Sequence, residues 1–189
     1  MSYFVNAGVF LIQTLFEFFI GLFLVRALLL AVNASFYDPI CQFVYKLTNP
    51  LITPLRGYVP RWRKIEIASL LVAVLLALIE LALLAGLFGA NFSLPGWLLG
   101  ALVDVLNLAL WIMLWAILIR CVLSFVVSEH YNPTAQLLTQ ITEPVVRPFR
   151  RLLPALGGLD FSCWFASLAL ILARLLILAP LGDLVAQLN

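Results

Sequence analysis

Long apolar stretches alternate with shorter polar ones along the 189 residues of this chain. Four apolar stretches, at roughly 9–32, 65–90, 101–127 and 161–182, exceed the about 20 residues of helix that cross a bilayer. Only helices and closed barrels satisfy their backbone hydrogen bonds within lipid. Because these stretches are continuous runs rich in Leu and Ala, they predict four transmembrane helices. We therefore expect an all-α membrane protein.

The pattern repeats at an offset of 94 residues, without a gap across the polar part of each half. An internal repeat fixes the architecture of a chain. We predict two repeats, 1–94 and 95–189, each a span, a proline-rich polar stretch and a second span. Two spans per repeat leave both in the same orientation, so we expect a pseudo-twofold axis along the membrane normal. The coinciding pairs are Arg26 and Arg120, Tyr37 and Tyr131, Pro39 and Pro133, Thr48 and Thr142, Pro50 and Pro144, Pro54 and Pro148, Arg56 and Arg150, and Pro60 and Pro154.

Each proline-rich stretch opens with the start signal of a short helix. Asp38 and Asn132 are good N-cap residues, and Pro39 and Pro133 suit the first helical position. The apolar residues that follow lie three and four apart, which places them on one helix face. The spacing predicts a short amphipathic helix in each repeat.

The later prolines predict where these helices end. Pro50 and Pro144 disfavour helical backbone in the residue before them, so we expect the helices to stop near Thr48 and Thr142. The segments that follow are apolar apart from arginine and too short to cross the bilayer. We expect them to lie in the membrane interface, with the arginines reaching lipid phosphates. The interfacial segments span 38–60 and 132–154, and their structural prolines are Pro39, Pro50, Pro54, Pro60, Pro133, Pro144, Pro148 and Pro154.

Composition identifies lipid as the solvent of this chain. Hydrophobic residues make up 65% of it, charged residues make up 11%, and the mean hydropathy is +1.13. A soluble domain is about half apolar and about a quarter charged. The net charge of +2 says little about partners. The distribution of charge along the chain is more informative, because it predicts the topology.

Eight basic residues lie between the first and second spans or between the third and fourth, and none lies at either terminus or in the 91–100 connection. By the positive-inside rule, both proline-rich loops are expected in the cytoplasm and both termini on the outer side. The paired arginines favour either binding of anionic headgroups or a partner protein, or topology control and surface anchoring. The lipid- or partner-binding candidates are Arg26, Arg56, Arg120, Arg147, Arg150 and Arg151.

Charged side chains also fall within or near the spans. At the bilayer centre each costs about 2.5–3.5 kcal/mol on insertion scales, so each needs a partner or a function. Arg26 and Arg120 lie near the cytoplasmic ends of their spans and are expected to snorkel. The alternative is that they cap the interfacial helices or bind lipid phosphate. The other charges within the spans are Glu17, Glu80, Asp104 and Arg174.

Glu80 and Arg174 are repeat equivalents of opposite charge near mid-membrane. We expect Arg174 to pair with Glu80 or Glu17, away from lipid. Such a pair could be a structural salt bridge that fixes helix register, which we favour, or part of a polar conduit. The chain lacks the H-E-x-x-H, G-x-S-x-G and phosphate-loop motifs, and its three cysteines suggest no metal site. We therefore expect no enzyme, no catalytic residues, no cofactor, no metal and no nucleic-acid partner.

The repeated motif resembles the YggT family. Each copy combines an arginine late in a span, an aromatic–polar–Pro step, the prolines and arginine described above, and an acidic residue before the next span, Glu66 or Asp160. The first copy departs from the pattern, since Arg63, Lys64 and Ile65 stand where the second has Gly-Gly-Leu. The resemblance covers nearly the whole chain.

The resemblance implies a bacterial inner-membrane protein linked to osmotic and extracytoplasmic stress, with potassium uptake proposed for some members. Plastid relatives are tied to membrane biogenesis and cytochrome assembly. The short chain and its few intramembrane polar groups favour a scaffold, assembly or stress factor that acts through the basic cytoplasmic face; the alternative is an ion-transport component that uses the intramembrane charges. The expected partners are membrane lipids, an unidentified membrane or cytoplasmic protein, or a second copy of the chain.

Overall fold

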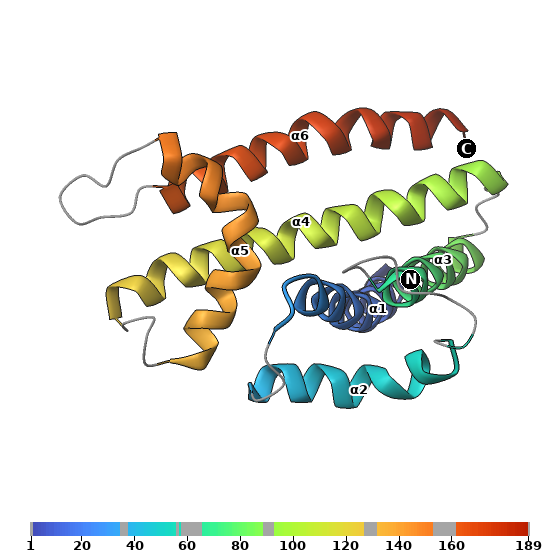
Figure 1. Ribbon diagram of the computed structural model, residues 1–189. Coiled ribbons are helices and arrows are strands. Elements are labelled where there is room, and N and C mark those ends of the chain that lie inside the picture. Colours follow the sequence, from blue (N-terminus) through green and yellow to red (C-terminus); the bar gives the residue numbers. More distant parts are fainter. Residues whose placement is uncertain are drawn as a thin grey trace.

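The computed structural model describes residues 2–34, 38–55, 57, 66–88, 93–126, 132–152 and 162–188. These residues form six helices and no strand (Figure 1). The helices are α1 Ser2–Ala31, α2 Pro39–Leu55, α3 Ile67–Phe88, α4 Leu94–Val126, α5 Pro133–Leu152 and α6 Ser162–Leu188.

Four of the helices, α1, α3, α4 and α6, are long and apolar enough to cross a membrane. The four predicted spans are therefore confirmed, and the chain is a multi-pass membrane protein. Three of the observed helices extend beyond the predicted spans: α1 and α4 each begin seven residues earlier and α6 ends six residues later, whereas α3 lies within its predicted span. Helix α6 continues through Pro180 to Leu188. The apolar pattern locates each span, but it does not predict where the helix begins and ends.

The spans form two hairpins, α1 with α3 and α4 with α6. The hairpins meet because α4 packs against both α3 and α1, and the core between them is built from apolar residues of these three helices and Ile52 of α2. Helix α6 has α4 and α5 as its main partners, and α4 lies between α6 and the first hairpin (Figure 1). A pseudo-twofold axis would pair α6 with α1 as closely as α3 pairs with α4. The expected pseudo-twofold arrangement is therefore wrong.

Helices α2 and α5 begin as the sequence predicts. The Asp38 side chain accepts a hydrogen bond from the backbone N–H of Ile40 at 2.8 Å, and Asn132 accepts one from Thr134 at 2.9 Å. These bonds satisfy amides that have no partner within the helix. Proline occupies the first helical position of both helices, where its missing N–H has no consequence.

The predicted ends of α2 and α5 are wrong. Both helices continue beyond Thr48 and Thr142, with Pro50, Pro54, Pro144 and Pro148 inside them. A proline within a helix removes one backbone hydrogen bond, and packing here outweighs that loss. Ile52 in α2 and Val146 in α5, both past the first internal proline, are fully buried against the spans.

Helix α2 shows three distinct faces. Cys41, Val44, Tyr45, Thr48 and Ile52 are buried, and they recur with helical spacing. A second stripe, rotated by about a third of a turn, is apolar and exposed. It consists of Ile40, Phe43, Leu47 and Leu51. The third face is polar and exposed, and it consists of Gln42, Lys46, Asn49 and Thr53.

Candidate functional site

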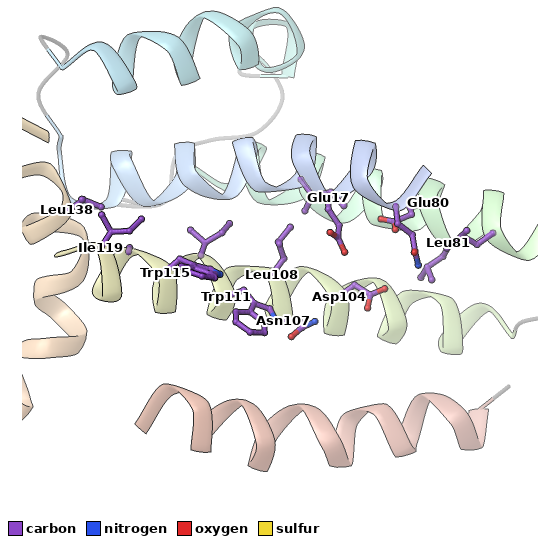
Figure 2. A pocket seen from close by; sticks show the side chains of 15 residues that line it. Glu17, Glu80, Leu81, Asp104, Asn107, Leu108, Trp111, Trp115, Ile119 and Leu138 are labelled. Atoms are coloured by element: carbon purple, nitrogen blue, oxygen red, sulfur yellow. The ribbon is translucent and has the colours of Figure 1, made fainter. Parts of the chain in front are cut away.

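A cavity of about 770 Å³ lies between the two hairpins, lined by α1, α3 and α4, with Leu138 of α5 at one end (Figure 2). Three carboxylates line it, one from each span: Glu17, Glu80 and Asp104. The amides of Gln13 and Asn107 add further polar groups. Figure 2 shows the three carboxylates at the same end of the cavity.

The rest of the cavity is apolar and aromatic. It follows α4 from Asp104 past Trp111 and Trp115 to Ile119 (Figure 2). Fifteen residues of helix correspond to about 22 Å, so the cavity extends along much of the span. Its described lining residues include no Lys, Arg or His. Carboxylates held in a membrane without a basic partner need protons or cations to balance them.

The carboxylates do not form a chelating cluster. Among the described residues, no group of three or more His, Cys, Asp or Glu side chains is arranged to hold a metal ion. Glu17 is exposed at the cavity, whereas Glu80 is half-buried. The arrangement therefore offers separated carboxylates around a hollow, without a tight coordination shell.

Arg174 does not make the expected ion pair. Its Nε donates to the side-chain oxygen of Asn107 at 2.8 Å, and its guanidinium lies 4.3 Å from the centroid of the Trp111 ring. Within the described residues it has no salt bridge to Glu80 or Glu17, so the predicted charge pair is wrong. The position of Arg174 along its span predicts its depth but not the direction of its side chain. The rotation of α6 points Arg174 towards α4 of the same hairpin.

Arg26 is buried at the other end of α1, close to α2. Its Nε donates to Glu66 Oε2 at 2.7 Å, and its Nη1 donates to Thr48 Oγ1 at 2.7 Å and to Asn49 Oδ1 at 2.8 Å. The guanidinium also lies 4.8 Å from the centroid of the Tyr45 ring. This first arginine clasp, formed by Arg26, Thr48, Asn49 and Glu66, connects α1, α2 and the residue before α3.

Arg120 forms the equivalent clasp in the second repeat. Its Nη1 donates to Thr142 Oγ1 at 2.9 Å, and its Nη2 donates to Glu143 Oε2 at 3.1 Å. Glu143 also accepts from Arg150 at 3.5 Å and is 36% exposed. The counterpart of Glu66 is Asp160, which lies outside the described residues. The second arginine clasp, formed by Arg120, Thr142 and Glu143, therefore shares its carboxylate with a surface arginine.

These clasps correct the expectation that Arg26 and Arg120 snorkel to lipid. Their exposed fractions are 0% and 4%, and Nη1 of each donates to a threonine of α2 or α5. The alternative that they cap the amphipathic helices is also wrong, because both arginines contact the middle of the helix. Because both side chains are buried, neither is exposed to a headgroup or a partner.

Of the remaining binding and structural candidates in the loops, some are exposed on α5 and others lie outside the described residues. Arg147, Arg150 and Arg151 are exposed on α5. Arg56, Pro60 and Pro154 lie outside the described residues. The sequence-based reasoning missed the roles of Thr48, Thr142, Asn49, Glu66, Asn107 and Trp111. The sequence carried a signal for Thr48 and Thr142, because the spacing from arginine to threonine is the same in both repeats.

Comparison with known proteins gives one consistent result. The CCB3/YggT family model matches the chain twice, over residues 5–87 and 99–181. An uncharacterized protein of Pseudomonas aeruginosa is 40% identical over 179 residues, which cover 94% of this chain and 91% of the relative. The uncharacterized protein YggT of Escherichia coli K12 is 38% identical over 83% of this chain and 81% of its own length.

A further relative is the "uncharacterized protein in proC 3'region" of Vibrio alginolyticus, 37% identical over 95% of this chain and 96% of its own. No solved structure matches the chain. The twofold match agrees with the repeat seen in the helices, each copy containing two spans and one amphipathic helix. The chain therefore belongs to the CCB3/YggT family, as a membrane protein with two tandem family repeats.

Proposed function

We propose that the protein is a transport component that binds monovalent cations in the acidic cavity and passes them across the membrane. One observation carries this proposal: Glu17, Glu80 and Asp104 come from three different spans and face one cavity that no basic side chain among its described lining residues balances. Ionisable residues inside a bilayer are retained where they serve an ion or proton pathway.

The separation of the carboxylates favours a monovalent ion. A site for Ca²⁺ gathers six to eight oxygens at about 2.3–2.6 Å, and the described residues offer no such cluster. A hydrated monovalent cation or a proton needs only polar groups and room for water. Potassium, implied by the family resemblance, fits this class, and so does sodium.

The apolar part of the cavity sets a condition on transport. Between Trp111 and Ile119 the lining offers no charged group. Hydrophobic constrictions gate channels by excluding water. Passage therefore requires this part to hydrate, so the resting state holds a cation at the carboxylates and blocks it farther along.

Uptake of radioactive rubidium into proteoliposomes tests the function. We expect wild-type protein to support uptake, and Glu80→Gln to reduce it at least tenfold because it removes a carboxylate from the cavity. Glu143→Gln is the matched control, since Glu143 is a carboxylate of α5 outside the cavity lining. Equal uptake by wild type, Glu80→Gln and empty vesicles would refute transport.

A second candidate, a scaffold or assembly factor, has support on a different surface. Arg147, Arg150 and Arg151 are exposed on α5, and Lys46 is exposed on α2. The positive-inside rule favours the basic loops on the cytoplasmic side of a bacterial plasma membrane, so these cations would face the inner leaflet. A role in osmotic or envelope stress would then depend on a protein recruited there.

Co-purification from native membranes separates the two candidates. A scaffold loses a specific partner when Arg147 and Arg151 are both replaced by Gln, while rubidium uptake stays unchanged. A transport component shows the reverse, with uptake lost in Glu80→Gln and no partner dependent on the arginines.

A further inference from the structure

The acidic cavity offers far more apolar surface than charge. Ten of its fifteen lining residues are apolar or aromatic, and six of these follow one another along α4 between Leu108 and Ile119. Its volume of about 770 Å³ is within the about 300–1,000 Å³ of sites that bind organic ligands, which are mostly apolar and aromatic with a few polar groups. An alkali ion, which oxygen atoms bind, would use only one end of such a cavity.

The charged and the apolar parts of the cavity lie apart along α4. Asp104 and Trp115 are eleven residues apart, which corresponds to about 16 Å of helix. Figure 2 shows the three carboxylates at one end, with Trp115 and Ile119 towards the other. A compact cation at the carboxylates cannot contact Trp115 at the same time, whereas an elongated ion with its charge at one end can contact both.

The apolar part of the cavity is open to the membrane. Trp115 and Ile119 line it, yet 58% and 46% of their surfaces stay exposed on a helix long and apolar enough to span the bilayer. A charged group that carries a long apolar chain partitions into a membrane, because burial of the chain offsets part of the cost of the charge. Such an ion can therefore enter the cavity from the lipid side.

We propose that the cavity binds single-chain organic cations, with the ammonium head at the carboxylates and the apolar chain along α4 towards Trp115. Three carboxylates and no basic side chain among the described lining residues determine the sign of the head. The apolar part, which stops a hydrated alkali ion, is the part that holds the chain. The inference rests on the proposed function for the location of the site, and it names a further class of ligand for that site.

Protection of the carboxylates from chemical modification tests the ligand class. The full chain in bilayers is treated with a hydrophobic carbodiimide, and mass spectrometry follows Glu80 and Asp104. We expect dodecyltrimethylammonium to protect them at a concentration at least tenfold lower than tetramethylammonium, which has the same charge and no chain. 1-Dodecanol, which has the chain and no charge, should not protect. Equal half-protecting concentrations for the two ammonium ions, or protection by 1-dodecanol, overturn the proposal.

Variants at two tryptophans separate contact with the chain from its partition into the membrane. Trp115→Ala should raise the half-protecting concentration of dodecyltrimethylammonium at least threefold and leave that of tetramethylammonium unchanged. Trp164→Ala is the matched control, since Trp164 is 61% exposed on α6 and lies outside the cavity lining. Trp111 is unsuitable, because the guanidinium of Arg174 lies 4.3 Å from the centroid of its ring.

The control should change neither concentration. No shift in Trp115→Ala, or the same shift in Trp164→Ala, shows that the chain does not follow α4 and overturns the proposal. Trp115→Gln should act in the same direction as Trp115→Ala, which keeps the test valid if the first variant does not fold. Unchanged protection by tetramethylammonium shows in each variant that the carboxylate end of the cavity is intact.

The outcomes separate this inference from the proposed function. Protection by dodecyltrimethylammonium that depends on Trp115, without rubidium uptake into proteoliposomes, supports the organic-cation site and refutes transport of alkali ions. Rubidium uptake without such protection supports transport and overturns the organic-cation site.

Discussion

Arg26 and Glu66 form a buried ion pair that closes the first repeat. Nε of Arg26 and Oε2 of Glu66 are 2.7 Å apart, and the exposed fractions of the two side chains are 0% and 2%. Glu66 lies immediately before α3, and Thr48 of α2 receives a second bond from the same guanidinium. The pair therefore fixes α2 against both spans of its repeat.

Replacing Arg26 by Gln should destabilise the protein more than replacing Arg120 by Gln. Removing one partner of a buried ion pair costs about 3–5 kcal/mol, because the other charge stays buried and unpaired. Arg120 pairs with the partly exposed Glu143, whose charge water can solvate. Thermal unfolding of the purified variants in the same detergent measures the difference.

Two further variants test the same contacts. Arg26→Lys keeps the charge but loses the planar fork that reaches Glu66, Thr48 and Asn49 together, so it should recover only part of the stability. Glu143→Gln keeps a side-chain oxygen as an acceptor for the buried Arg120 but removes its counter-charge, so it should lower the midpoint by an intermediate amount, less than Arg26→Gln does. Equal midpoints for Arg26→Gln and Arg120→Gln would show that burial does not separate the two clasps.

Thr48→Val should loosen α2 with almost no change of shape. The variant removes an acceptor for a charged donor, a hydrogen bond worth about 1.5–3 kcal/mol. Cys41 lies on the buried face of α2 and is fully covered. We expect N-ethylmaleimide to modify Cys41 faster in Thr48→Val than in wild type, measured by mass spectrometry. Thr53→Val, on the exposed face, is the control and should leave the rate unchanged.

Cys41 also makes stability sensitive to alkaline pH. Burial, and to a smaller extent the charge of Asp38, raises the pKa of this thiol above its ordinary value of 9.0. The folded protein then holds the thiol proton more tightly than the unfolded chain does. This contribution to stability is present below pH 9.0 and is lost as pH rises through the folded pKa. Denaturation midpoints should fall less steeply above this pH in Cys41→Ala, and identical slopes would contradict the assignment.

Short-range chemistry predicted part of this structure, and long-range packing decided the rest. Asp38 and Asn132 act on amides two residues away, so their caps follow from sequence. Pro50 was expected to stop α2, but the burial of Ile52 carries the helix through it. Arg26 and Glu66 lie 40 residues apart, and local sequence patterns do not predict their contact.

The same distinction separates the parts of the acidic cavity. The depth of Glu17, Glu80 and Asp104 follows from their positions along predicted spans. Their convergence depends on helix rotation, which a uniformly apolar span does not encode. The predicted partner of Arg174 is wrong for that reason. The rotation of α6 places Arg174 against Asn107 and Trp111 of α4.

The three faces of α2 predict its position in the bilayer. A nitroxide at Leu47→Cys, on the exposed apolar stripe, should be accessible to oxygen dissolved in lipid. A nitroxide at Gln42→Cys, on the polar face, should be accessible to a water-soluble nickel reagent. Electron paramagnetic resonance of the two labelled proteins in bilayers measures both accessibilities. Water access at both positions would place α2 away from the interface.

Arg174→Lys should not preserve the contacts of Arg174. A guanidinium both bonds Asn107 and stacks on Trp111, whereas an ammonium lacks the planar face. The hydrogen bond of a charged group is worth about 1.5–3 kcal/mol and a cation–π contact about 0.5–2 kcal/mol. We expect a lower unfolding midpoint for Arg174→Lys in detergent, and a midpoint equal to wild type would contradict these contacts.

The most direct measurement locates the cation among the carboxylates. A hydrophobic carbodiimide modifies carboxyl groups in apolar surroundings, and mass spectrometry of the purified protein in bilayers identifies the modified residue. We expect modification of Glu80 or Asp104 to fall as rubidium concentration rises at constant pH and ionic strength, with no change at Glu143. Modification that is independent of rubidium at every carboxylate of the cavity would contradict a cation site there.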